Sequence, residues 1–229
     1  MFRGLALGIA AVALSMGGAT SFAKAPDTWD GLHKVRAKRV DAVYLLPNAD
    51  FRPYTKVMLD PTQVAFRKDW QRDMNTAFTG GRISDKDVEK IVGEARSDFG
   101  ALLSKAYQDA GYAVVTAPGP DVLQVSTAII NLYVAAPDRM TPGVTRTYSV
   151  EAGEATLALE ARDSLTGALL GRAVDERSAG NSGPYRRTSV SNRADFEQLF
   201  KTWAKMSATG LDELKALSPI DTEGQPAKR

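Results

Sequence analysis

Apolar and polar positions along the chain recur in two periods, and each period predicts one kind of element. Over residues 84–110 the apolar side chains return every three or four positions, which is typical of an amphipathic helix. Ser84 and Asp87 have the spacing of a capping box at its start. A second stripe of this kind covers residues 191–217 and is interrupted at Gly210. We therefore expect two amphipathic helices.

A period of two predicts the strands. Residues 155–161 alternate apolar with polar side chains, and residues 168–176 follow after a turn, so the pair predicts an antiparallel hairpin. Residues 122–134 are apolar on both faces for part of their length, which is typical of a central strand. Shorter extended segments are expected at 40–47, 54–60, 61–70 and 112–115. This order predicts an α+β fold, in which two amphipathic helices pack on one face of a mainly antiparallel mixed sheet.

The first residues have the pattern of a secretory signal peptide. A basic start at Arg3 precedes an apolar run over residues 5–16, and Ser21 and Ala23 form a small-x-small cleavage pattern. The run is shorter than the roughly 20 residues that a membrane-spanning helix needs. We expect export to the periplasm and cleavage near Ala23, which leaves no transmembrane anchor.

The length of 229 residues, with 44% hydrophobic and 24% charged side chains, fits one folded domain with short extensions. A polar segment with only Trp29 and Leu32 as large apolar groups precedes the first predicted strand. We expect four regions: a signal peptide at 1–23, a polar lead-in at 24–39, a single α+β domain at 40–217 and a flexible tail at 218–229.

Composition excludes several classes of function. The 29 basic and 27 acidic residues nearly cancel, so nothing indicates the basic surface of a nucleic-acid-binding protein. The absence of cysteine excludes disulfides, thiolate metal sites and a lipid-modified N-terminus. His33 is the one histidine, which excludes a multi-histidine metal centre. We expect neither a metal nor a cofactor.

Catalytic motifs are missing as well. The segment Gly180–Gly183 lacks the spacing of a nucleophile elbow, and the chain has no phosphate loop or dinucleotide fingerprint. Asp85, Asp87 and Glu89 resemble the beginning of a calcium loop, but acidic residues are already favoured in the first turn of a helix. The sequence therefore favours a protein without catalytic activity.

Two segments, 136–153 and 178–191, are long for loops of a compact domain. If the three strands after residue 119 form a meander, both segments leave the sheet at the same end. They carry guanidinium and aromatic groups suited to an anionic ligand or a protein partner. These candidate binding residues are Arg139, Met140, Arg146, Tyr148, Tyr185, Arg186 and Arg187. The alternative is a pair of solvated loops without a specific role.

A resemblance covers about residues 29–217. The stretch VDAVYLLPNADFRPYTKVMLDPTQVAFRKDW, the later GPDVLQVSTAIINL and the hairpin ARDSLTGALLGRAVDER resemble a bacterial envelope family known only as domain of unknown function 3313. Members of that family are exported, and many are lipoproteins, so the resemblance implies an envelope setting. The missing cysteine departs from the lipoprotein pattern.

These observations lead to one hypothesis and two alternatives. The hypothesis is an exported periplasmic binding or accessory protein of the cell envelope, whose partner is an envelope protein or an anionic ligand. One alternative is a hydrolase that uses acidic residues on envelope glycans or esters. The other is a structural envelope component without a discrete site.

Overall fold

The structure, a computed structural model, describes residues 26–77, 82–135, 147–149, 152–180, 185–187 and 189–222. Its helices are α1 (Trp70–Ala77), α2 (Asp85–Asp109) and α3 (Ser189–Leu217). Its strands are β1 (Thr28–Trp29), β2 (Leu32–Val35), β3 (Ala42–Leu45), β4 (Lys56–Leu59), β5 (Gln63–Phe66), β6 (Ala113–Val115), β7 (Val122–Val134), β8 (Thr147–Ser149), β9 (Gly153–Asp163), β10 (Leu169–Ala179) and β11 (Tyr185–Arg187).

One large sheet organises the fold. Its strand order is β1-β2-β3-β10-β9-β7-β4-β6, and β5 also pairs with β7. All pairings from β1 across to β7 are antiparallel, whereas β4 and β5 pair with β7 in parallel and β6 pairs with β4 in parallel. The predicted α+β fold with a mainly antiparallel mixed sheet is confirmed, including the hairpin of β9 and β10 and the central position of β7.

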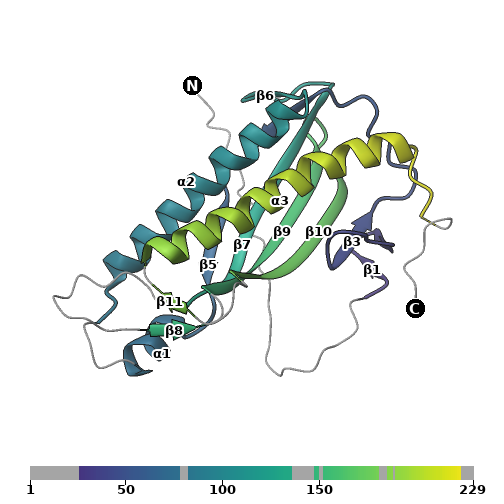
Figure 1. The fold of residues 1–229 in the computed structure, drawn as a ribbon. Helices are drawn as coiled ribbons and strands as arrows, with labels where there is room; N and C mark the ends of the chain where they lie inside the picture. The colour runs from purple at the N-terminus through teal and green to yellow at the C-terminus, as the bar shows by residue number, and fades with distance from the viewer. Residues whose placement is uncertain are drawn as a thin grey trace, which may run out of the picture.

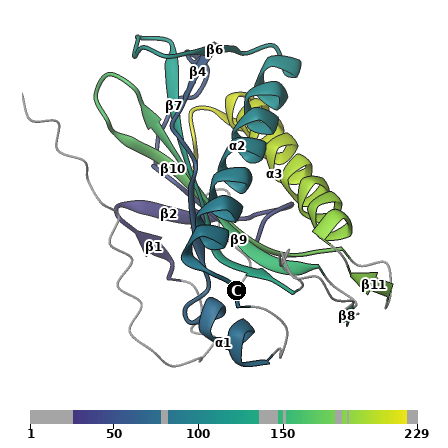
Figure 2. The same ribbon diagram turned by 90° about the vertical axis from the view of Figure 1, so that its left-hand side faces the viewer.

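The helices α2 and α3 lie side by side across one face of this sheet (Figures 1 and 2). Phe99 and Leu103 of α2 and Phe200 and Trp203 of α3 are buried there together with Ile129 of β7. Burying these large side chains removes apolar surface from water and is the main force that holds the layers together. Over the described ranges, no helix combines the length and apolarity that crossing a membrane requires.

The start of α2 follows the predicted capping box. The Asp87 N–H donates to Ser84 Oγ at 3.3 Å, and the Ser84 N–H donates to the Asp87 carboxylate at 2.8 Å. The Ser84 hydroxyl also donates to this carboxylate at 2.6 Å, and the hydrogen bonds from the Ser84 side chain and backbone lower the pKa of Asp87. Asp87 therefore has a structural role at this helix start. Among the described residues, no group of three or more His, Asp and Glu could hold a metal ion.

Two regions differ from the pattern in the sequence. Within the polar lead-in expected at 24–39, residues 28–35 form the hairpin of β1 and β2, for which no strands were predicted, and Leu32 in it is fully buried. The extended segment predicted at 61–70 forms β5 up to Phe66, but its last residue, Trp70, begins the helix α1. The Trp70 indole stacks on Phe66 with ring centroids 4.0 Å apart and donates its N–H to the carbonyl of Val134 at 3.2 Å. These tertiary contacts outweigh the local period of two.

Candidate functional site

A cavity of about 760 Å³ lies between α3 and the strands β3, β9 and β10. This volume is within the roughly 300–1,000 Å³ that is usual for ligand pockets. Most of its lining is apolar and comes from the sheet and from the second half of α3. Protein interiors rarely leave voids much larger than a water molecule, so this space is the main candidate for a functional site.

The floor of the cavity is a row of three side chains on adjacent strands. Ala173 of β10 is paired in register with Val43 of β3 on one side and with Leu159 of β9 on the other. All three line the cavity, and all three are only half-buried although they lie on the face that the helices cover. Their neighbours Leu157 and Ala161 are buried. The helix layer therefore leaves these three positions open.

The roof is a stripe along α3 that contains two small residues. Ser207 and Gly210 lie between Trp203 and Leu214 on the lining side of the helix. A Cβ atom added at Gly210 would have no neighbour within 4 Å. Leu217 ends the stripe and is 47% exposed. The small side chains at the middle of the stripe thus leave space between α3 and the sheet unfilled.

Polar groups in the interior of the cavity are already paired. Asp175 of β10 is 3% exposed, and its carboxylate accepts the indole N–H of Trp203 at 2.8 Å and the Arg177 Nε–H at 2.6 Å. The hydroxyls of Tyr107 and Ser207 share a hydrogen bond of 2.7 Å. Burial raises the pKa of Tyr107 to about 12, so this phenol is neutral at physiological pH. The interior therefore offers an apolar surface.

The rim of the cavity is basic. It is formed by residues 36–40, which connect β2 to β3, and by the last turns of α3. Arg39 bridges the two sides through an ion pair with Glu213 at 2.9 Å, and its carbonyl accepts a hydrogen bond from Arg177 Nη2 at 2.7 Å. Arg36 and Lys38 are exposed, and within the described part of the chain neither side chain makes a hydrogen bond or an ion pair. Two cations at the rim are therefore free to bind an anion.

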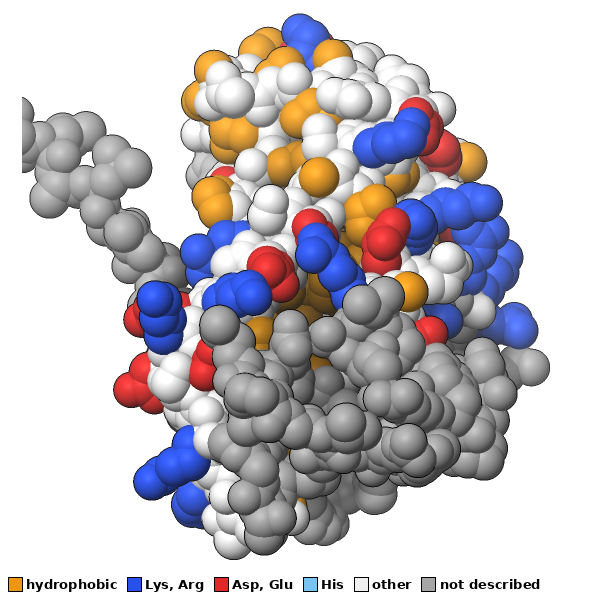
Figure 3. Space-filling model, turned by 60° about the vertical axis from the view of Figure 1, so that its left-hand side comes forward, with side chains coloured by type: hydrophobic (Ala, Val, Ile, Leu, Met, Phe, Trp, Pro, Cys, Tyr) orange, Lys and Arg blue, Asp and Glu red, His pale blue; other side chains and the backbone are white. Residues whose placement is uncertain are grey.

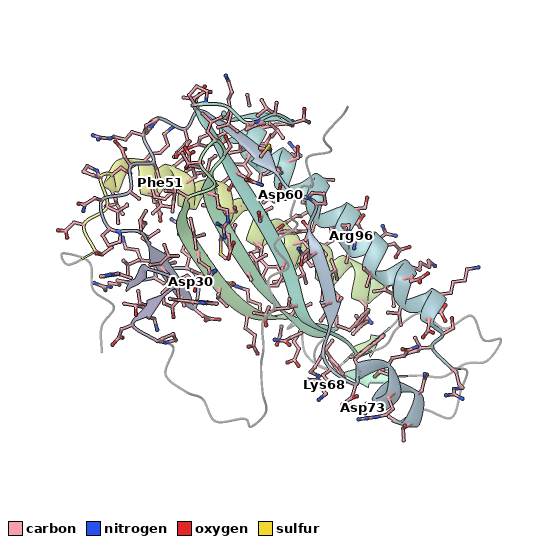
Figure 4. All side chains as sticks on the ribbon, turned by 180° about the vertical axis from the view of Figure 1, so that it is seen from behind. Asp30, Phe51, Asp60, Lys68, Asp73 and Arg96 are labelled. Atoms are coloured by element: carbon pink, nitrogen blue, oxygen red, sulfur yellow. The ribbon has the colours of Figure 1, made fainter. Side chains whose placement is uncertain are left out.

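The opposite face of the sheet carries a second polar cluster (Figure 4). Arg172 of β10, 7% exposed, donates through Nη2 to Glu160 at 2.5 Å and to Asp30 at 3.0 Å. Its guanidinium lies 3.9 Å from the centre of the Trp29 ring, and its Nη1 has no hydrogen-bond partner. Arg162 also donates to Glu160, at 2.8 Å. This cluster fastens the β1–β2 hairpin to the sheet.

Four of the sequence-predicted binding residues, Tyr148, Tyr185, Arg186 and Arg187, belong to β8 and β11, which lie near α1 (Figures 1 and 2). There β8 and β11 form a small antiparallel ladder that pairs Arg186 with Tyr148, Tyr185 with Ser149 and Arg187 with Thr147. The two long segments are therefore neighbours, as their strand directions predicted. Arg139, Met140 and Arg146 lie outside the described residues, as do the side chains of Tyr148, Tyr185, Arg186 and Arg187.

The sequence does not predict the cavity. Its floor residues follow the same alternation of apolar and polar side chains as other strand residues. The distance between these strands and α3 depends on tertiary packing. The signal present was the run of small residues in the stripe of α3, Ser207 and Gly210, which interrupts an otherwise bulky apolar face. On the face drawn in Figure 3, basic and acidic side chains of the described residues lie next to one another, without a large patch of one charge.

Solved structures resemble this fold at low identity. The PelC dodecamer from Paraburkholderia phytofirmans is 13% identical with a TM-score of 0.35, and the match covers 82% of this chain and 98% of that chain. Protein XCC0632 from Xanthomonas campestris, of the DUF330 family, is 12% identical with a TM-score of 0.36 over 72% of this chain and 86% of that chain. A DUF4136 family protein from Bacteroides thetaiotaomicron is 8% identical with a TM-score of 0.33, and the match covers 83% of this chain and 99% of that chain. Likenesses at this level assign no role to the chain.

Sequence comparison gives a firmer result. Among curated proteins, none matches this chain. The family described as protein of unknown function (DUF3313) matches over residues 20–207, which include every strand of the sheet and the floor of the cavity. The resemblance stated from the sequence is thereby confirmed, and the chain belongs to the DUF3313 family.

Proposed function

We propose that this protein is an exported, non-enzymatic binding protein of the cell envelope that holds an apolar ligand in the cavity beneath α3. The observation that carries the proposal is the cavity itself. Its volume is that of a ligand pocket, and its floor of Val43, Ala173 and Leu159 is apolar and open. Export is supported by the signal-peptide pattern that ends near Ala23.

Binding explains the cavity better than packing does. Apolar side chains that face an open space lose dispersion contacts and leave apolar surface in contact with water, and both effects destabilise the fold. An apolar ligand would restore the contacts without disturbing any polar group, because Asp175, Tyr107 and Ser207 already have partners. The cavity thus has the chemistry of a site for an apolar molecule.

A larger side chain at Gly210, in the roof of the cavity, should weaken this binding. The variant Gly210→Leu places a leucine side chain where nothing lies within 4 Å of the added Cβ. We expect the affinity for the apolar fluorophore N-phenyl-1-naphthylamine to fall at least about tenfold, since the side chain takes space that the probe needs. The measurement is a fluorescence titration of delipidated protein that has been purified from the periplasmic fraction, with the mature N-terminus near Lys24 checked by mass.

Gly93→Leu is the matched control. Gly93 is an exposed position inside α2, and an added Cβ there also has open space around it, but it does not line the cavity. Both variants gain helix propensity over glycine, by up to about 1 kcal/mol, so neither should unfold. The proposal fails if wild type does not bind the probe or if the two leucine variants bind it equally.

We also propose the paired segments around β8 and β11 as a contact surface for an envelope protein or an anionic ligand. The ladder supports this because it brings Arg186 and Arg187 next to Tyr148 and Thr147 along the backbone. The proposed binding residues are Arg139, Arg146, Tyr148, Tyr185, Arg186 and Arg187.

Joint substitution of four of these residues tests that surface. With Arg146, Tyr185, Arg186 and Arg187 all changed to alanine, we expect the proteins recovered with the tagged chain from envelope extracts to change, because guanidinium and aromatic groups dominate such contacts. The control changes four exposed residues of α2, namely Lys86, Glu89, Lys90 and Glu94, to alanine. An unchanged set of recovered proteins contradicts the role of these segments. No observation on the described residues favours the hydrolase or the purely structural alternative.

A further inference from the structure

We infer that the ligand of the cavity is a long-chain fatty carboxylate, whose acyl chain lies beneath α3 and whose carboxylate lies against Arg36 and Lys38. The inference rests on the proposed function and specifies the chemistry of its ligand. It combines two observations: an interior whose polar groups are all engaged, and a rim that carries two unpaired cations.

The interior selects for an aliphatic chain. Polar groups along a ligand would lose their hydration inside the cavity and would find no free hydrogen-bond partner there. This loss of free energy would weaken binding. Asp175 is held by Trp203 and Arg177, and Tyr107 is held by Ser207. What remains exposed is hydrocarbon from the sheet and from α3. The part of the ligand inside the cavity is therefore apolar throughout.

The rim selects for a negative charge at one end of that chain. Arg39 is neutralised by Glu213. Arg36 and Lys38 have no such partner, and both belong to the connection that borders the opening. Guanidinium and ammonium groups donate strong charge-assisted hydrogen bonds to a carboxylate. Since the two cations lie on one side of the opening, they can bind a single small anionic head.

Leu217 lies between the charged rim and the apolar interior of the cavity. It lines the cavity at the end of α3 and is 47% exposed, one of the few large apolar side chains in the described residues that are so accessible. The first methylenes of an acyl chain next to its carboxylate would cover this side chain. Its exposure therefore fits a ligand that enters between residues 36–40 and the last turn of α3.

The test compares ligands that have the same sixteen-carbon chain but different polar head groups. Delipidated protein is titrated with palmitate, with hexadecanol and with hexadecyltrimethylammonium, each below its aggregation concentration, by displacement of N-phenyl-1-naphthylamine. We expect palmitate to bind about five to ten times more tightly than hexadecanol, which is the size of effect that a pair of partly exposed charge contacts gives. The quaternary ammonium compound should bind most weakly, because Arg36 and Lys38 repel it.

The variant Arg36→Gln/Lys38→Gln assigns that preference to the rim. We expect it to lose the advantage of palmitate over hexadecanol while hexadecanol binding stays unchanged. The matched control is Lys86→Gln/Lys90→Gln, which makes the same change of net charge at exposed positions of α2 outside the cavity. Shortening the fatty acid from sixteen to twelve carbons should weaken binding by about fourfold for each methylene that is lost from the cavity.

The outcomes separate the inference from the proposed function. Equal binding of palmitate and hexadecanol, or an advantage that persists in Arg36→Gln/Lys38→Gln, overturns the fatty carboxylate while the apolar site stands. Tighter binding of lysophosphatidylglycerol or of a two-chain phosphatidylglycerol than of palmitate also overturns it, in favour of a lipid head group. If wild type binds neither hexadecanol nor the naphthylamine, the proposed function itself fails.

Discussion

Replacing Trp203 with alanine should lower the free energy of unfolding by about 3–5 kcal/mol, the range for truncating a large buried aromatic side chain. Trp203 is fully buried and stacks on Phe200 with ring centroids 6.2 Å apart. Trp203 already borders the cavity, so fewer neighbouring side chains can move into the space that its removal leaves. The loss is a large share of the roughly 5–15 kcal/mol by which domains are stable. Equilibrium denaturation in urea measures it.

The variant Trp203→Phe separates the two contributions of this residue. It keeps an aromatic ring in the core but removes the indole N–H that donates to the Asp175 carboxylate at 2.8 Å. Arg177 still donates to that carboxylate, so we expect a smaller loss of about 1–3 kcal/mol. Leu217→Ala, at an exposed position of the same helix, is the control. If the alanine variant at position 203 were as stable as that control, Trp203 would not anchor α3.

Elements whose contacts are local could be predicted from the sequence. The capping box at Ser84 and the regular stripe behind it located α2, because a helix start and a helix period depend on residues within a few positions. The alternating hairpin located β9 and β10 for the same reason. The apolar run that became β7 was long enough to indicate a central strand, and its two flanking neighbours confirm that position.

Features that depend on distant contacts could not be predicted. Leu32 is buried against Ala42 and Tyr44 of β3. The indole of Trp70, at the start of α1, contacts Phe66 and Val134. The parallel pairing of β4 with β7 leaves no trace in the period of either strand. The cavity likewise depends on the spacing between α3 and the sheet. Gly210 is therefore only an interruption of the stripe in the sequence, whereas in the structure it lines the cavity.

Arg172 is the second residue whose replacement should have a large effect. The variant Arg172→Met removes the cation from the buried cluster and leaves the Glu160 carboxylate with Arg162 as its remaining partner. Breaking a buried ion pair from one side costs about 3–5 kcal/mol, and we expect the lower end of this range because Arg162 stays. Arg193→Met, which removes an exposed ion pair with Asp98, should cost less than about 1 kcal/mol.

The double variant Arg172→Met/Glu160→Met distinguishes an uncompensated charge from lost packing. With both charges replaced by apolar side chains of similar length, no carboxylate remains buried without its partner, so we expect much of the lost stability to return. A double variant that is less stable than Arg172→Met would show that packing of the guanidinium on Trp29, 3.9 Å from the ring centre, matters more than the charge pair.

The loss of stability caused by Arg172→Met should also depend on pH, and the ionisation of Glu160 determines whether the loss grows or shrinks as the pH falls. Burial opposes ionisation of this carboxyl, but the hydrogen bonds from Arg162 and Arg172 outweigh burial, so the pKa of Glu160 is lowered. A carboxyl whose pKa is lower in the folded state stabilises the fold above its unfolded pKa of about 4.3, and this contribution is lost as the pH falls through the folded pKa. The stability difference between wild type and Arg172→Met should therefore be largest near pH 7 and narrow below about pH 4.3. Urea denaturation across this pH range measures it, and a difference that stays constant or widens in acid contradicts the ionised pair.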